Sequence, residues 1–129
     1  MADSDDLLEP PAAVVAYLDA QRRGSPPDRA CTKAAVKAVL AELERRAPGR
    51  SVELRVPPYA AIQLIAGTAH RRGTRPALVQ LAAPDLIDLA VGSLLWADGL
   101  ADGRVRASGE RSDLSGYLPL FDPAVQFPS

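Results

Sequence analysis

The sequence has little cysteine, few aromatic side chains and almost no net charge. Cys31 is the single cysteine among 129 residues, so no disulfide can form within the chain, and a lone cysteine fits a reducing compartment such as the cytoplasm. With one Trp, three Tyr and two Phe, the core is expected to consist of Leu, Val, Ile and Ala. With a formal net charge of −1, the protein has no positive field that would attract the phosphate backbone of nucleic acid. We therefore exclude nucleic acid as a partner.

Long hydrophobic runs are also missing. No stretch approaches the roughly 18 to 20 consecutive apolar residues of a membrane span. Residues 1–9 carry Asp3, Asp5, Asp6 and Glu9 and lack the basic start and apolar run of a secretory signal. We therefore expect a soluble, cytoplasmic protein without stable membrane insertion, preceded by a disordered acidic segment over residues 1–9.

Motifs of catalytic and metal chemistry are missing too. His70 is the one histidine, and no Cys, Glu or second His stands around it at the spacing of metal ligands. The sequence contains no G-x-S-x-G nucleophile elbow and no glycine loop for phosphate. We predict a protein that is not an enzyme and holds no metal or cofactor. The basic cluster of Arg71, Arg72 and Arg75 could meet an anionic head group, although a solvated loop explains it as well.

Two helices are predicted in the first part of the chain. Residues 10–23 begin with two prolines, which suit a helix start, and end before Gly24. Residues 28–47 begin with a capping Asp28 and end before Pro48. In this second helix the apolar residues recur at helical spacing, at Val36, Val39, Leu40 and Leu43.

Alternating apolar and polar residues then predict strands, with further helices inserted late. The strands are expected at 52–56, 59–65, 77–81 and 104–108, and the helices at 84–91, 95–102 and 112–118. This order is typical of an α+β fold with a mainly antiparallel sheet of four to five strands, covered by about five helices. We expect one domain over residues 10–120 and an irregular tail over residues 121–129.

A family resemblance comes from two phrases. Residues 79–118 read VQLAAPDLIDLAVGSLLWADGLADGRVRASGERSDLSGYL, which resembles the C-terminal half of sterol carrier domains. Residues 47–63 read APGRSVELRVPPYAAIQ, which is similar to the compact bacterial branch of that family. The Trp-x-Leu strand of longer sterol carrier domains is missing and the hairpin is shorter, so the size of any lipid tunnel stays open.

The resemblance implies non-enzymatic binding of an apolar, lipid-like ligand such as a fatty acyl chain or an isoprenoid. The ligand would lie in a tunnel between the sheet and the C-terminal helices. The candidate lining residues are Ile62, Leu64, Val79, Leu81, Leu86, Leu89, Leu95, Trp96, Leu100, Val105 and Leu118.

An alternative is equally compatible with the same residues. They can pack a filled core, and the chain is then an interaction or dimerisation module that assists a partner enzyme. Trp96 shows the two interpretations side by side: it is either a wall of the ligand tunnel or a large core anchor whose indole N–H meets a backbone carbonyl.

Overall fold

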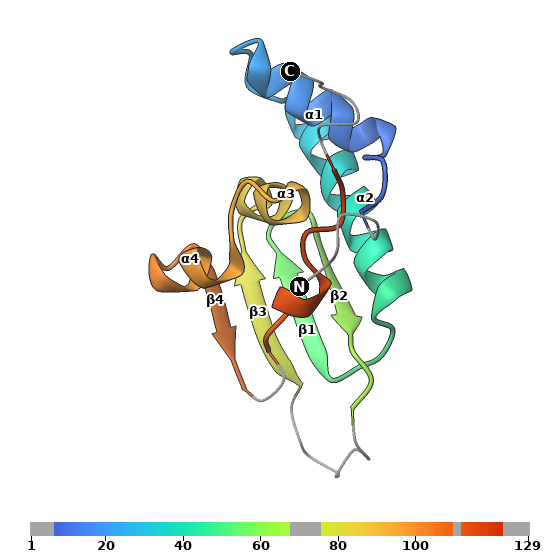
Figure 1. Ribbon diagram of the computed structural model, residues 1–129, viewed down its shortest axis with the longest axis vertical. Helices are drawn as coiled ribbons and strands as arrows, with labels where there is room; N and C mark the ends of the chain where they lie inside the picture. The colour runs from blue at the N-terminus through green and yellow to red at the C-terminus, as the bar shows by residue number, and fades with distance from the viewer. Residues whose placement is uncertain (1–6, 68–75, 110–111, 123–129) are drawn as a thin grey trace.

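The computed structural model describes residues 7–67, 76–109 and 112–122. Over these residues the chain forms four α-helices, four strands and one 3₁₀ turn (Figure 1). The helices and strands begin and end within two residues of the predicted positions. In chain order they are α1 (Ala12–Arg22), α2 (Arg29–Arg46), β1 (Val52–Val56), β2 (Ala60–Leu64), β3 (Ala77–Leu81), α3 (Ala83–Val91), α4 (Trp96–Ala101), β4 (Val105–Ser108) and η2 (Ser115–Tyr117).

Helix α2 is the longest element and starts at a side-chain cap. The carboxylate of Asp28 accepts the backbone N–H of Cys31 at 2.8 Å, as the sequence predicts, and the hydroxyl of Thr32 donates to the Asp28 carbonyl at 2.9 Å. The buried residues of α2 recur every three or four positions, so one side of the helix faces the core. Helix α1 packs against α2 and buries Val14 and Tyr17.

The sheet has the order β2-β1-β3-β4 and is mixed, not mainly antiparallel as expected. β1 pairs antiparallel with β2, and β3 pairs antiparallel with β4, but β1 and β3 run parallel. The parallel pair arises because β2 folds back beside β1 as a hairpin, after which the chain crosses to the other side of β1. A period of two identifies which face of a strand is buried and carries no information about strand direction.

The helix count also differs from the expectation, since the described residues contain four α-helices and not five. The predicted helix at 112–118 is reduced to the three-residue turn η2. Pro119 follows this turn closely; it lacks a backbone N–H, and its ring disfavours helical geometry at Leu118.

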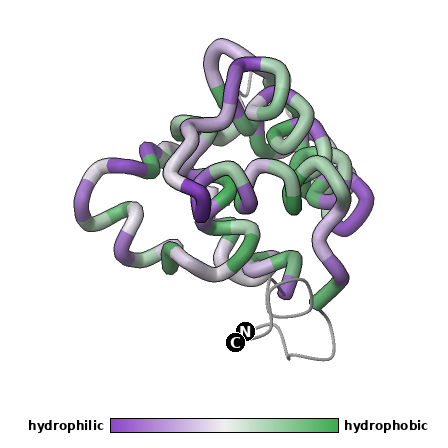
Figure 2. The backbone as a smooth tube through the Cα atoms, turned by 90° about the horizontal axis from the view of Figure 1, so that it is seen from above, coloured by the Kyte–Doolittle hydropathy of each residue, from purple (hydrophilic) through white to green (hydrophobic). Residues whose placement is uncertain are grey.

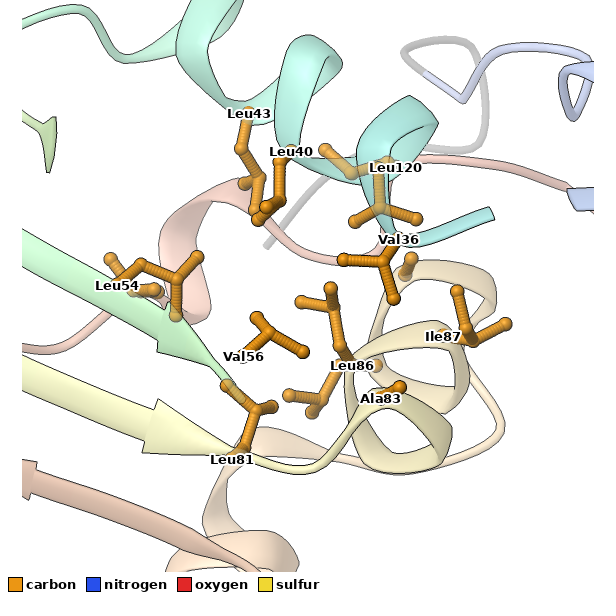
Figure 3. Packing of buried hydrophobic residues seen from close by; sticks show 14 of the residues in the cluster. Val36, Leu40, Leu43, Leu54, Val56, Leu81, Ala83, Leu86, Ile87 and Leu120 are labelled. Carbon is orange, nitrogen blue, oxygen red and sulfur yellow. The ribbon is translucent and has the colours of Figure 1, made fainter. Parts of the chain in front are cut away.

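One face of the sheet carries the core. Val52, Leu54 and Val56 are fully buried, whereas Glu53 and Arg55 between them lie on the other, more exposed face. Figure 3 shows Leu54 and Val56 pointing toward side chains of α2 and α3, among them Leu40 and Leu86. These side chains fill the space between the sheet and the two helices.

Hydrophobic positions are distributed along the described chain in short stretches, as Figure 2 shows. No helix among the described residues is both long enough and apolar enough to cross a bilayer.

The first and last described segments lie together. Leu8 and Phe121 form a parallel bridge, in which the Leu8 N–H donates to the Leu120 carbonyl and the Asp122 N–H donates to the Leu8 carbonyl, both at 3.0 Å. The N–H groups of Leu120 and Phe121 both donate to the carbonyl of Ala90 in α3. Leu120 and Phe121 are buried in the core. Leu8 and Phe121, assigned from sequence to the two end segments, are thus part of the packed structure.

The backbone just after α2 makes a close crossing with the backbone just after β2. Gly49 has a φ of 150°, and a Cβ atom there would lie 2.1 Å from both the carbonyl carbon and the oxygen of Ile65. The Ile65 N–H donates to Ala47 at 2.7 Å, and the Ser51 hydroxyl donates to the Ile65 carbonyl at 2.6 Å. Ile65 itself has a φ of 67°, which is rare for a β-branched residue. The crossing holds α2 against the β1–β2 hairpin.

Candidate functional site

Two adjoining depressions flank the side chain of Trp96, and we refer to them together as the Trp96 groove. The first has a volume of about 390 Å³ and the second about 370 Å³. Trp96, Ala97 and Ser115 line both. The first is completed by Leu89, Gly92, Leu94, Leu95, Gly116, Leu118 and Pro119, and the second by Leu100, Ala107, Ser112 and Asp113.

The end of α3 forms one wall of the groove. Gly92 takes up a left-handed conformation with a φ of 84°, which a residue with a side chain adopts only with strain. The N–H groups of Ser93 and Leu94 then donate to the Asp88 carbonyl at 2.8 and 3.1 Å. This turn ends α3 after Leu89 has been placed in the wall and sends the chain into α4.

Helix α4 forms the opposite wall and rests directly on β4. A Cβ atom on Gly99 would lie 2.8 Å from the Cγ2 atom of Val105, so glycine permits this close approach. Trp96 is 9% exposed, whereas Leu95 is 64% exposed and Leu100 is 42% exposed. The groove thus combines a nearly buried aromatic ring with two large aliphatic side chains that face solvent.

The structure separates the candidate lining residues into two groups. Leu89, Leu95, Trp96 and Leu118 line the first depression, and Leu100 lines the second. Leu64, Val79, Leu86 and Val105 are buried in the core, while Leu81, also buried, and Ile62, partly buried, border other depressions remote from Trp96.

Several residues that line the groove were not predicted from the sequence. Ser115, Gly116 and Pro119 reach the groove because the chain makes a 3₁₀ turn there and not a regular helix. Leu94 is also part of the wall. The apolar run Leu94-Leu95-Trp96 was a usable signal for Leu94, but small polar residues of the closing turn carry no pattern that points to a binding site.

The indole of Trp96 forms no hydrogen bond with the described part of the chain. The expected bond from its N–H to a backbone carbonyl is therefore not seen there. The ring is held by packing within the hydrophobic core cluster. A large aromatic surface packed in this way contributes mainly through the area it removes from water.

Among the described lining residues Asp113 is the one charged side chain, and it lies in the second depression. The Ser115 side chain and backbone N–H hydrogen-bond to the Asp113 carboxylate, which lowers the pKa of Asp113, and the N–H lies 2.9 Å from the carboxylate oxygen. Asp113 is exposed and ionised at neutral pH. Neither depression has a Lys, Arg or His among its described lining residues.

Asp88, on α3, has a raised pKa because burial disfavours its charge and Asp85 lies near, while Arg104 acts in the opposite direction. A raised folded-state pKa means that the ionised carboxylate destabilises the fold above that pKa and ceases to do so below the ordinary value of 3.8. Asp88→Asn should therefore raise the melting temperature at pH 7, and the gain should shrink as the pH falls toward 3.5. Asp98→Asn, at an exposed position of α4, should give no such gain; equal shifts in both variants would contradict the burial argument.

Among the described residues, no group of three or more His, Cys, Asp or Glu side chains is placed so that it could hold a metal ion. His70 and the basic cluster of Arg71, Arg72 and Arg75 lie outside the described residues.

Comparison with known protein families identifies a match over most of the chain. A family model described as a bacterial SCP ortholog, where SCP stands for sterol carrier protein, matches residues 28–120. This range covers well over half of the chain and contains every residue that lines the Trp96 groove. No curated protein matches the chain.

Proposed function

Because the chain belongs to the bacterial orthologue family of sterol carrier proteins, we propose that it binds an apolar, lipid-like ligand in the Trp96 groove and carries it without making or breaking covalent bonds. The ligand class of this proposal is a fatty acyl chain or an isoprenoid. The proposal places the protein in the cytoplasm, because a single cysteine, Cys31, fits a reducing compartment.

The observation that carries the proposal is the exposure of aliphatic side chains beside a depression. Leu95 and Leu100 are among the large hydrophobic residues that stay exposed, and each lines one half of the groove. Covering them with a ligand chain removes apolar surface from water, which contributes about 25 cal/mol per Å². The first depression, which also includes Leu89 and Leu118, is where such a chain would lie.

The Trp96 groove lies elsewhere than the expected tunnel between the sheet and the helices that cover it. Leu54, Val56 and Leu81 meet side chains of α2 and α3 (Figure 3), and all three are buried. A ligand at this position would have to displace packed side chains, at a cost in stability. The proposed site therefore uses the space between α3, α4 and η2, where depressions already exist.

A Leu95→Glu variant tests the site. A carboxylate at this edge must be desolvated when an apolar chain binds beside it, so we expect at least tenfold weaker uptake of a fluorescent fatty acid or isoprenoid alcohol, which is about 1.4 kcal/mol. Fluorescence titration measures the dissociation constant. Leu8→Glu is the matched control, because Leu8 is 41% exposed and lies outside the groove. Equal binding by both variants would remove the groove from consideration.

The filled interior supports a second candidate function, that of an interaction module for a partner enzyme. Native mass spectrometry of the purified chain separates the two functions. A reproducible, stoichiometric lipid favours the carrier, and organic extraction then identifies its class. A chain that is empty and takes up neither probe favours the module.

A further inference from the structure

The two halves of the Trp96 groove differ in polarity. Leucine side chains dominate the first depression, whereas the second holds Asp113 and Ser112. Ser115 lines both, so the end of a chain that lies in the first depression can extend past Ser115 into the second. An amphiphile bound in the groove therefore places its apolar chain in the first depression and its polar end in the second, where polar side chains can fix its orientation.

The hydroxyl protons in the second depression are already used within the protein. The Ser112 hydroxyl donates to the Gly109 carbonyl at 3.1 Å, and the Ser115 hydroxyl donates to the Asp113 carboxylate. The Ser115 backbone N–H donates to the same carboxylate at 2.9 Å. An ionised carboxylate has about four acceptor positions, so Asp113 can still accept a hydrogen bond from a ligand. Asp113 and the two serines thus present acceptors to the polar end of the ligand.

The indole N–H of Trp96 is the side-chain donor that remains among the described lining residues. It forms no hydrogen bond with the described part of the chain. No buried side-chain N or O atom within the described ranges lacks a hydrogen-bond partner, so this N–H reaches solvent. A ligand hydroxyl can donate to Asp113 and still accept a bond from this N–H or from water, whereas a carboxylate can only accept.

Charge acts in the same direction as hydrogen bonding. Asp113 is exposed, and no Lys, Arg or His among the described lining residues offsets its negative charge. A ligand that ends in a carboxylate brings a second negative charge close to Asp113. At an exposed site such a like-charge contact weakens binding by about fivefold.

We propose that Asp113 selects the head group of the ligand, so that the protein prefers an amphiphile ending in a hydroxyl over one ending in a carboxylate. This inference rests on the proposed lipid-carrying function and narrows its ligand class to alcohols with a long apolar chain. Fatty alcohols and isoprenoid alcohols share this chemistry.

Competition among ligands of matched chain length tests the selection on the full chain. Dodecan-1-ol, dodecanoate and farnesol, an isoprenoid alcohol with a twelve-carbon main chain, each displace a fluorescent isoprenoid alcohol at pH 8. We expect both alcohols to bind about fivefold more tightly than dodecanoate at about 20 mM salt, and this ratio to shrink at about 500 mM salt, where charges are screened. The tighter of the two alcohols identifies the source of the hydroxyl.

Asp113→Asn is the decisive variant. It removes the charge and keeps an oxygen that accepts the Ser115 N–H, so the fold should tolerate it, which thermal melting checks. Dodecanoate should then bind within about twofold of dodecan-1-ol. Asp98→Asn is the matched control, because Asp98 is exposed on α4 and lines neither depression; it should keep the preference of the unmodified protein.

The outcomes separate this inference from the proposed function. If the unmodified protein binds dodecanoate as tightly as the alcohols, or if Asp113→Asn keeps the full preference, the selection by Asp113 is overturned while lipid binding stands. If the fluorescent probe itself does not bind, the proposed function fails and the selection fails with it.

Discussion

Replacing Gly49 with alanine should cost about 4 kcal/mol or more of the free energy of unfolding, a large share of the roughly 5 to 15 kcal/mol that holds a domain together. The added Cβ would lie 2.1 Å from the carbonyl carbon and oxygen of Ile65 and 2.3 Å from the nitrogen of Ala66. These are backbone atoms, so no side-chain rotation relieves the overlap. The hydrogen bond from Ile65 to Ala47 must then lengthen or break.

Urea unfolding followed by circular dichroism measures this loss. Gly116→Ala is the control, because a Cβ at Gly116 meets no atom within 4 Å and the change should stay within about 1 kcal/mol. If the two variants unfold at the same urea concentration, the chain must be able to separate Gly49 from Ile65 at little cost, and the crossing does not hold α2 against the hairpin.

Replacing Trp96 with alanine should lower the free energy of unfolding by about 3 kcal/mol, because removal of a buried aromatic side chain leaves a cavity that the surroundings fill only in part. Trp96 is 9% exposed and packs within the core cluster. We expect the preference among ligand chain lengths to change less than the stability does. This expectation treats the ring first as an anchor of α4 and only second as a surface for the proposed ligand.

Thermal melting by circular dichroism, together with titration of acyl chains of two lengths, measures both effects. Leu95→Ala is the control for stability, since Leu95 is 64% exposed and its loss should cost within about 0.5 kcal/mol. An unchanged melting temperature with altered chain-length preference would show instead that Trp96 is a ligand wall.

The sequence predicts the elements well because each has a local cause. The cap at Asp28, the repeating apolar residues of α2 and the alternation at Val52, Leu54 and Val56 are all read within a few residues. The parallel pairing of β1 with β3 has no such signal. It depends on the path between them, and alternation is the same for parallel and antiparallel strands with one buried face.

The candidate site could be predicted only in its C-terminal part. Leu89, Leu95 and Trp96 lie where the resemblance to sterol carrier domains is densest, and they do line the groove. Val79 and Leu86 were also assigned to the ligand, but the structure places both in the core. An apolar residue that faces inward looks the same in sequence whether it meets another side chain or a ligand, because hydrophobic burial is non-directional.

The bridge between Leu8 and Phe121 couples two segments at opposite ends of the described chain. Each segment donates a backbone hydrogen bond to the other, and the N–H groups of Leu120 and Phe121 donate in turn to the Ala90 carbonyl of α3. Releasing the segment at Leu8 therefore frees the amide of Asp122 and removes the outer support of two buried residues. We therefore expect the two segments to open together as one cooperative unit anchored on α3, and not to fray independently.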